Sequence, residues 1–223
     1  MSTTKPDPVI PAPYAAVLGD QDPILVMATT PDRLRKSLRG LSEAQLTKRP
    51  LPGKWSIKEI VAHLADGEMI LGSRYRFVAA QDRPVIIGYD QDAFVVMLGV
   101  ANTTTADLVD DFALARAVNL GLLDRIPIES LDRVGIHSER GEESILKMLH
   151  MCAGHDLHHL RQIETIRVGL FGAPKKRKAA PKKKAVKKGT SKPPKKTGKA
   201  ASKPAKKAAK PARKPAKKAG KKK

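Results

Sequence analysis

The sequence predicts an all-α fold, an antiparallel four-helix bundle with a long crossover connection, followed by a disordered basic C-terminal tail. Three observations lead to this prediction. Four segments repeat apolar side chains at steps of three and four residues, no series of strands can be recognised between them, and the composition changes abruptly after residue 172. Sites in such bundles are commonly built from side chains on facing helices.

Composition divides the chain into three regions. Residues 1–19 contain four prolines between positions 6 and 13 and are predicted to form an extended arm. Residues 20–172 are long enough for one well-buried domain, and residues 1–172 together carry 19 basic and 22 acidic side chains, a formal charge of −3. Residues 173–223 hold 24 Lys or Arg and no acidic residue. This tail also lacks Leu, Ile, Met and aromatic residues, so we expect it to stay disordered.

The first two helices are predicted over residues 22–38 and 56–80. The first has apolar residues at Ile24, Leu25, Leu34 and Leu38, and Pro31 is expected to bend or divide it. The second begins at Ser56, where the pattern S-x-x-E, completed by Glu59, predicts a capping box. Its apolar positions follow helical intervals: Ile57, Ile60, Val61, Leu64, Leu71 and Val78.

The other two helices are predicted over residues 105–126 and 142–170. The third ends before Pro127 and has an apolar stripe of Leu108, Phe112, Ala115, Leu122 and Ile126. The fourth has an inward stripe of Ile145, Met148, Cys152, His155, His159, Ile163 and Ile166. Between the second and third helices, Pro84-Val-Ile-Ile-Gly resembles a strand and residues 92–100 suit a short helix in a long crossover; we favour the helix.

Three histidines are candidates for a metal site. His155 and His159 lie four residues apart on one helix face, an arrangement that supplies two ligands to a divalent cation, and His63 on another helix can supply the third. One coordination position would then remain for water or substrate. The competing interpretation is structural, because an isolated histidine on an apolar stripe is more commonly a hydrogen-bonded core residue. His158 replaces His159 if the helix is rotated by about 60°.

Other residues near these histidines have two interpretations. Asp66 shares a face with His63 and is the candidate catalytic residue, orienting a ligand or holding a metal-bound water, or is simply solvated. Gln162 returns to the face of His155 and is a candidate substrate contact, whereas Asp156 and Arg161 point sideways. Cys152 is a soft ligand or, more commonly, a small core residue. Two further side chains are expected to be structural or exposed: Trp55 at the helix entrance and His137 in a loop.

Two sequence blocks carry a resemblance to a known family. GKWSIKEIVAHLADGE at residues 53–68 and HDLHHLRQI at residues 155–163 resemble the DinB-like (DinB/YfiT-type) family of four-helix-bundle metalloproteins. The resemblance implies a divalent metal, often zinc or nickel, held by His63, His155 and His159. It also implies chemistry known in some relatives, which are thiol S-transferases or isomerases that use low-molecular-weight thiols such as bacillithiol or mycothiol.

A metal-dependent thiol transferase is therefore the first functional hypothesis. A dication in an apolar bundle lowers the pKa of a bound water or thiol. Because no general base other than Asp66 is visible, attack by a thiolate on an electrophilic small molecule requires fewer protein groups than hydrolysis does.

The basic tail supports a second hypothesis, a non-catalytic DNA-binding or nucleoid-associated protein whose bundle is structural or regulatory. Residues 173–223 repeat Lys, Ala and Pro much as linker-histone tails do, which favours duplex phosphate contact without sequence preference. Acidic proteins, polyphosphate and anionic lipid are rival partners. A lone Cys152 and the lack of a long apolar run predict a cytoplasmic protein without a membrane span, which the tail would associate with the nucleoid. A homodimer is compatible with the sequence.

Overall fold

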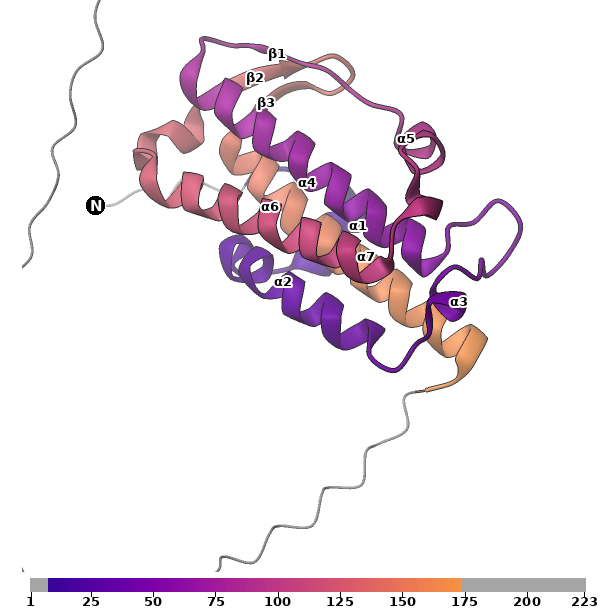
Figure 1. Ribbon diagram of the computed structural model, residues 1–223. Coiled ribbons are helices and arrows are strands. Elements are labelled where there is room, and N and C mark those ends of the chain that lie inside the picture. Colours follow the sequence, from indigo (N-terminus) through magenta and orange to yellow (C-terminus); the bar gives the residue numbers. More distant parts are fainter. Residues whose placement is uncertain (1–7, 174–223) are drawn as a thin grey trace, which may run out of the picture. The chain divides into compact units, whose positions relative to one another are not determined.

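The computed structural model describes residues 8–173 of the 223-residue chain, and these residues belong to one compact unit. Four long helices form a bundle, α2 (Pro23–Leu38), α4 (Ile57–Ala80), α6 (Thr105–Arg125) and α7 (Ile145–Phe171) (Figure 1). The predicted four-helix bundle is confirmed. The predicted basic tail lies outside the described residues. Within residues 8–173, no helix is both long and apolar enough to cross a membrane.

Side-chain caps fix where the long helices begin. The Ser56 hydroxyl accepts a hydrogen bond from the backbone N–H of Glu59, and the Glu59 carboxylate accepts one from the backbone N–H of Ser56, as the sequence predicts for α4. Ser144 caps α7 by accepting from the N–H of Lys147. Helix α7 therefore starts at Ile145 and not at residue 142, because the three preceding residues belong to a strand.

The helices do not simply alternate in direction. The expected antiparallel packing holds for α2 with α6 and for α4 with α7, whereas α4 with α6 and α2 with α7 run parallel. Near the start of α4, Lys58 donates to the carbonyl of Thr103, which directly precedes α6, and further along both helices Glu68 contacts Asn119. Parallel neighbours require long connections, and residues 81–104 provide the predicted crossover from α4 to α6.

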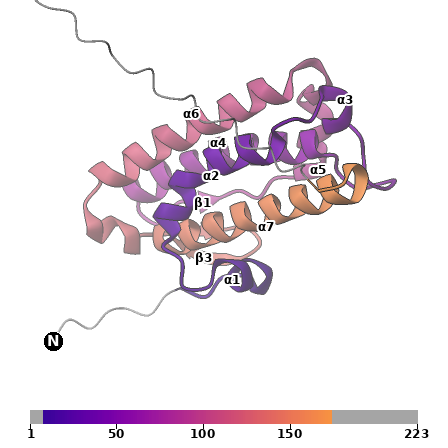
Figure 2. The ribbon, with the colours of Figure 1, turned by 90° about the horizontal axis from the view of Figure 1, so that it is seen from below.

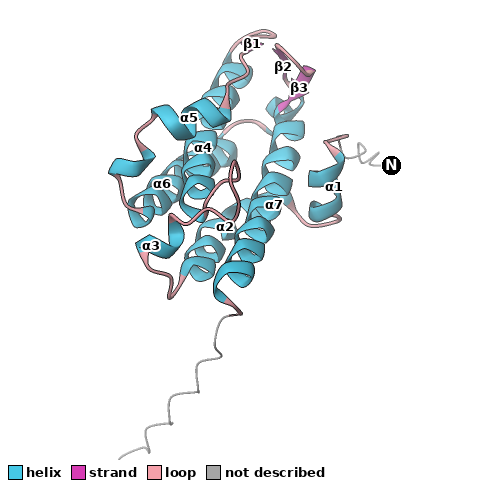
Figure 3. Ribbon diagram, turned by 90° about the vertical axis from the view of Figure 1, so that its right-hand side faces the viewer, coloured by secondary structure: helices cyan, strands magenta, loops and turns pink. Residues whose placement is uncertain are grey.

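A small three-stranded sheet covers one end of the bundle (Figure 3). Strand β1 (Val85–Ile86) pairs in parallel with β2 (Val134–His137), which pairs antiparallel with β3 (Gly141–Ser144). The crossover thus contains both predicted features, a strand and the helix α5 (Gln91–Met97). The prediction that no strand series occurs was wrong, because strands of two to four residues are too short to show a clear alternation.

Three shorter elements lie in the connections between the long helices and the sheet. Helix α3 (Glu43–Leu46) lies in the connection between α2 and α4. Two 3₁₀ helices, Val100–Asn102 and Ile128–Asp132, precede α6 and β2 respectively.

Pro31 does not divide the first long helix. Helix α2 continues through it and buries Val26, Met27, Thr30 and Leu34, so the predicted apolar face is wrong at Ile24 and Leu25, which are 40% and 62% exposed. A proline has no backbone N–H, so the carbonyl of Met27 lacks its usual helical donor. The buried side chain of Arg116 replaces that donor, with Nη1 2.9 Å from the Met27 oxygen.

The core consists of two apolar clusters. One gathers residues near the sheet, including Val78, Ile86 and Ile145, and the other gathers residues near the opposite end, including Ile57, Phe112 and Ile163. A set of fully buried polar residues belongs to neither cluster: Glu68, Arg116, Asn119 and Asp156. We call these four residues the polar layer.

The N-terminal region forms a helix where an extended arm was predicted. Helix α1 (Ala12–Leu18) packs along α7 (Figure 2), so the prediction for residues 1–19 was wrong over these seven residues. The approach is close because α7 has a glycine at the contact. A Cβ atom on Gly154 would lie 2.7 Å from both the Cβ and the carbonyl oxygen of Tyr14.

Replacing Gly154 with alanine is therefore expected to destabilise the protein by about 1–3 kcal/mol, because helix α1 must move to admit the methyl group. Gly169 is the matched control on the same helix, since nothing lies within 4 Å of its added Cβ. Gly169→Ala should be neutral or stabilising by about 0.5–1 kcal/mol. Urea unfolding of both variants checks this, and a similar stability for the two would contradict the described packing of α1.

Candidate metal centre

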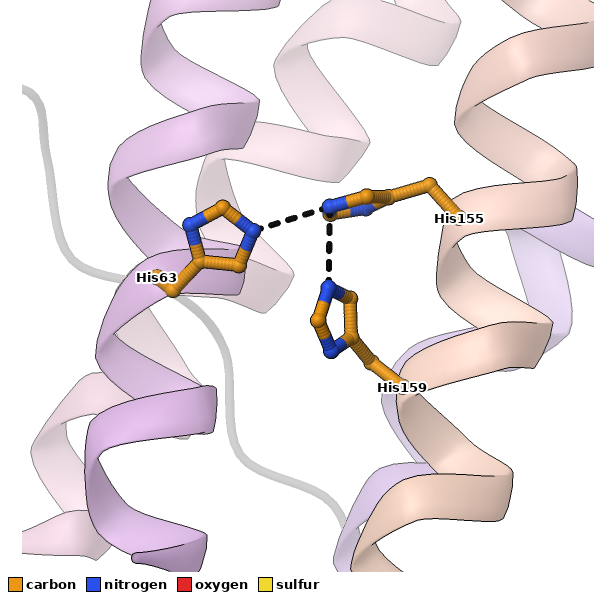
Figure 4. Close-up of side chains that lie close together, drawn as sticks. All are labelled: His63, His155 and His159. Carbon is orange, nitrogen blue, oxygen red and sulfur yellow. Dashed lines mark hydrogen bonds between the residues drawn. The ribbon is translucent and has the colours of Figure 1, made fainter. Parts of the chain in front are cut away.

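Three imidazole rings from two helices meet inside the bundle (Figure 4). Nε2 of His155 lies 2.8 Å from Nε2 of His63 and 3.1 Å from Nε2 of His159. One ligand atom from each histidine lies within 4.8 Å of the other two. His63 comes from α4, and the other two come from successive turns of the antiparallel neighbour α7. The structure thus brings together all three histidines that the sequence singled out.

A hydrogen bond to Gln162 leaves the Nε2 lone pair of His159 free for a ligand. Nδ1 of His159 lies 2.8 Å from Oε1 of Gln162, which has no proton to give, so Nδ1 donates and Nε2 keeps its lone pair. A zinc ion with ligands at about 2.05 Å in tetrahedral geometry holds its nitrogen ligands roughly 3.3 Å apart. The observed spacing and the all-imidazole donor set therefore fit a divalent cation such as zinc or nickel.

Burial keeps the cluster neutral. Desolvation, together with the neighbouring ring of His159, lowers the pKa of His63 to about 3. Desolvation also lowers the pKa of His159 to about 4, although its hydrogen bond to Gln162 acts in the opposite direction. The pKa of His155 falls well below its ordinary value because of burial and the two adjacent rings. Neutral imidazole is the form that binds metals, so the cluster is ready to bind at pH 7.

These shifts predict an acid-sensitive metal-free protein. A histidine whose pKa is lower in the folded state than its unfolded value of 6.5 favours unfolding once the pH drops below 6.5. At pH 5 the expected loss is about 2 kcal/mol for each such histidine, at 1.36 kcal/mol per pH unit. Urea unfolding of the metal-free protein at pH 7 and pH 5 measures this loss. His63→Asn should show a smaller loss than the parent, and an unchanged loss would contradict the shift.

The remaining histidines lie outside the cluster. His158 packs edge-on against Tyr14 and His159, so the alternative in which it replaces His159 is not adopted. Nδ1 of His150 lies 3.0 Å from the carbonyl of Leu146 on its own helix. His137 was expected in an exposed loop, but strand β2 buries it to 2% exposure. The sequence gives no signal for this, because the apolar residues of the strand, Val134 and Ile136, are only half-buried whereas Gly135 and His137 are buried.

The structure also places the other side chains that the sequence singled out near the histidines. Asp66 is not part of the histidine cluster, and burial, together with the nearby carboxylate of Asp111, raises the pKa of its carboxyl. A step of three residues from His63 turns it about 60° away around the helix. Gln162 contacts His159 directly, as described above, and Trp55 packs against His63 with ring centroids 5.0 Å apart. Cys152 is buried, and burial raises its pKa well above the ordinary value, so the interpretation as a core residue fits it best.

The polar layer is the main feature that the sequence reasoning missed. Arg116 is 1% exposed and donates to both oxygens of Asp156, at 2.6 and 3.1 Å, and to Glu68 at 2.8 Å. The other oxygen of Glu68 accepts from Asn119 at 2.9 Å. Asp156, which was expected to point sideways, is 1% exposed. With two carboxylates to one guanidinium, the layer carries an excess of negative charge close to the histidines.

A cavity of about 470 Å³ links these groups. His63 and His155 line it, as do the polar layer residues Glu68, Arg116 and Asp156. Side chains from α1, the crossover and the β2–β3 hairpin line it as well, including Tyr14, Tyr89 and His137. Its volume is suited to a small-molecule ligand, and most of the side chains that line it are polar or charged.

The fold and the histidine cluster define a class of protein, the helical bundle with a metal-binding centre between facing helices. Within that class, the family model of the DinB superfamily matches residues 27–163, and the chain belongs to this family.

Individual relatives are consistent with this assignment. A protein of Oceanobacillus iheyensis, named as a candidate metal-dependent hydrolase, is 26% identical over 138 residues, which cover 61% of this chain and 78% of the relative. A protein of Bacillus cereus with the same kind of name is 27% identical over 138 residues, covering 61% and 79%. The structure of YfiT from Bacillus subtilis, described as a probable metal-dependent hydrolase with an unusual four-helix bundle topology, is similar in fold. It aligns with a TM-score of 0.62 at 19% identity, covering 74% of this chain and 91% of YfiT.

Proposed function

We propose that this protein is a metal-dependent enzyme that transfers a low-molecular-weight thiol to an electrophilic small molecule. His63, His155 and His159 would hold the divalent cation, zinc or nickel. The observation that carries the proposal is the convergence of three neutral imidazoles, two of them buried and His155 half-buried, beside a cavity of small-molecule size. A bound dication would supply Lewis-acid polarisation and favour the deprotonated form of a thiol or water.

Thiol transfer is preferred over hydrolysis because the carboxylates around the cluster are not free. Glu68 and Asp156 are both bound to Arg116, and Asp66 is not part of the histidine cluster. Hydrolysis usually needs a general base that takes a proton from water. In thiol transfer the sulfur bonds to the electrophilic carbon, the leaving group departs, and the thiol proton passes to solvent. Metal-dependent hydrolysis is the rival reaction, because the relatives are named as metal-dependent hydrolases.

The test compares two reporters on protein reconstituted with zinc or nickel. The first reporter is 1-chloro-2,4-dinitrobenzene with bacillithiol, mycothiol or cysteine, and the second is 4-nitrophenyl acetate without any thiol. We expect thioether formation above the uncatalysed rate, and His155→Ala should remove the excess. If ester hydrolysis without a thiol is as fast as thioether formation, hydrolysis replaces thiol transfer as the proposed reaction. An absence of both reactions would remove this proposal.

The composition of residues 173–223 favours a second role. We infer that this segment, with 24 basic and no acidic side chains, binds duplex DNA without sequence preference and keeps the enzyme near the nucleoid. Removing residues 173–223 should abolish DNA binding in a fluorescence anisotropy assay and leave turnover of small substrates intact. If about ten lysines contact phosphates, the log–log salt slope should be on the order of −9. If the truncated chain loses its cellular function while turnover is intact, the non-catalytic DNA-binding alternative is favoured.

A further inference from the structure

The cavity beside the histidines is elongated along helix α4. His63 and Arg74, which are eleven residues apart on α4, line its two ends. At 1.5 Å per residue this separation spans roughly 16 Å along the helix axis. Apolar side chains lie between them on the same helix, Leu64 and Leu71. The far end is lined by the crossover and the hairpin, which contribute Tyr89, His137 and Arg140.

Arg74 is a partly buried cation that faces this cavity without a carboxylate partner. Its Nη2 donates to the carbonyl of Ile87 at 2.7 Å, and no carboxylate of the described residues lies within ion-pair distance of it. Burial and the neighbouring guanidinium of Arg140 lower the pKa of Arg74. Arg140 itself is engaged by Glu143 through two hydrogen bonds of 2.6 and 3.0 Å. Arg74 is therefore a cation at this end of the cavity that has no direct ion-pair partner among residues 8–173, while Glu143 and Glu139 act on its charge from further away.

His137 adds a second donor that lacks an acceptor. Its Nδ1 accepts from the backbone N–H of Glu139 at 3.1 Å, so in the neutral ring the proton resides on Nε2. This Nε2 is buried and has no hydrogen-bond partner among residues 8–173. Buried donors in native proteins are normally satisfied, so an unmatched one in a cavity wall indicates a ligand atom.

We propose that the end of the cavity formed by Arg74 and His137 binds a carboxylate of the substrate, so that the substrate is an elongated molecule with its reacting atom at the opposite end. One guanidinium and one N–H donor match the two oxygens of a carboxylate. A doubly charged phosphate fits less well, because Glu139 and Asp90 also line this end. This inference rests on the proposed function, since it assigns the reacting atom to the histidine end.

Two probes that differ only in charge test the subsite: 6-mercaptohexanoate and 6-mercaptohexanamide. Calorimetric titration of the full chain, with and without zinc, gives the Kd of each. We expect the acid to bind about tenfold more tightly than the amide, the effect of one charge-assisted pair. This preference should be present with or without zinc, because it does not involve His63, His155 or His159. Equal affinities of the two probes for the parent protein would overturn the proposal without any variant.

Two variants on one helix localise the effect. Arg74→Gln should reduce the preference for the acid to about one- to threefold. Arg76→Gln is the matched control, since the Arg76 guanidinium binds Gly72 and Asn119 and does not line the cavity, and it should leave the preference unchanged. A preference that survives Arg74→Gln would also overturn the proposal. If the protein binds no metal but still binds the acid more tightly than the amide, the metal proposal fails and the carboxylate subsite stands.

Discussion

His155→Ala is expected to lower the bound divalent metal from near one equivalent per chain to about a tenth or less, because three ligands are needed for a stable site. Among the three rings, His155 is central, with its Nε2 within 3.1 Å of the Nε2 atoms of both His63 and His159. Removing it leaves two imidazoles on different helices that no third ligand joins. Elemental analysis of protein purified without a histidine tag measures the effect.

His158→Ala is the matched control for this prediction. It removes an imidazole from the same turn of α7, but that ring packs against Tyr14 and is not part of the cluster. It should therefore keep the metal content of the parent protein. Circular dichroism of both variants checks that they are folded. An equal and negligible metal content in the parent and both variants would remove the catalytic interpretation altogether.

Arg116→Met is expected to lower the free energy of unfolding by about 3–5 kcal/mol, the cost of leaving buried charges without their partner. Arg116 is 1% exposed and is the shared partner of Glu68 and Asp156, which are also almost fully buried. Methionine has a similar length and fills the space, so the expected loss arises from the charges and hydrogen bonds. The carbonyl of Met27 would also lose the donor that compensates for Pro31.

Urea unfolding checks this prediction, with Arg125→Met as the control. Arg125 lies on the same helix, is exposed and donates only to the carbonyl of Gly121 on that helix, so its loss should cost less than about 0.5 kcal/mol. If the two variants are equally stable, the buried pairing around Arg116 does not contribute as described.

The long helices could be predicted from the sequence because each repeats its apolar residues over many turns. The capping box at Ser56 and the inward stripe of α7 through His155 and His159 are found as predicted. The sheet could not be predicted with the same ease, since a strand as short as Val85–Ile86 has no periodicity to detect. The relative direction of the helices could not be predicted from the apolar spacing within each segment either, because it depends on which helices the long connections make neighbours.

The candidate ligands were identified from their spacing and from the family motifs, whereas the polar layer was not. A signal for it is present in the sequence. Arg116 lies four residues after Phe112, on the predicted apolar stripe of its helix, and Glu68 lies four residues after Leu64. A charged residue at a core position indicates a buried partner. The identity of that partner follows only from the parallel packing of α4 against α6, which the sequence did not predict.

The polar layer also fixes the axial register of the bundle. A slip of one helix against another by a single turn, about 5.4 Å, is easily tolerated by interchangeable aliphatic side chains. Here such a slip would separate Arg116 from Asp156 and from Glu68, leaving charges unpaired in the interior. Because Asp156 directly follows His155, the same constraint sets the height at which the α7 imidazoles face the one on α4. The buried ion pairs thus set the relative height of the three imidazoles on their two helices.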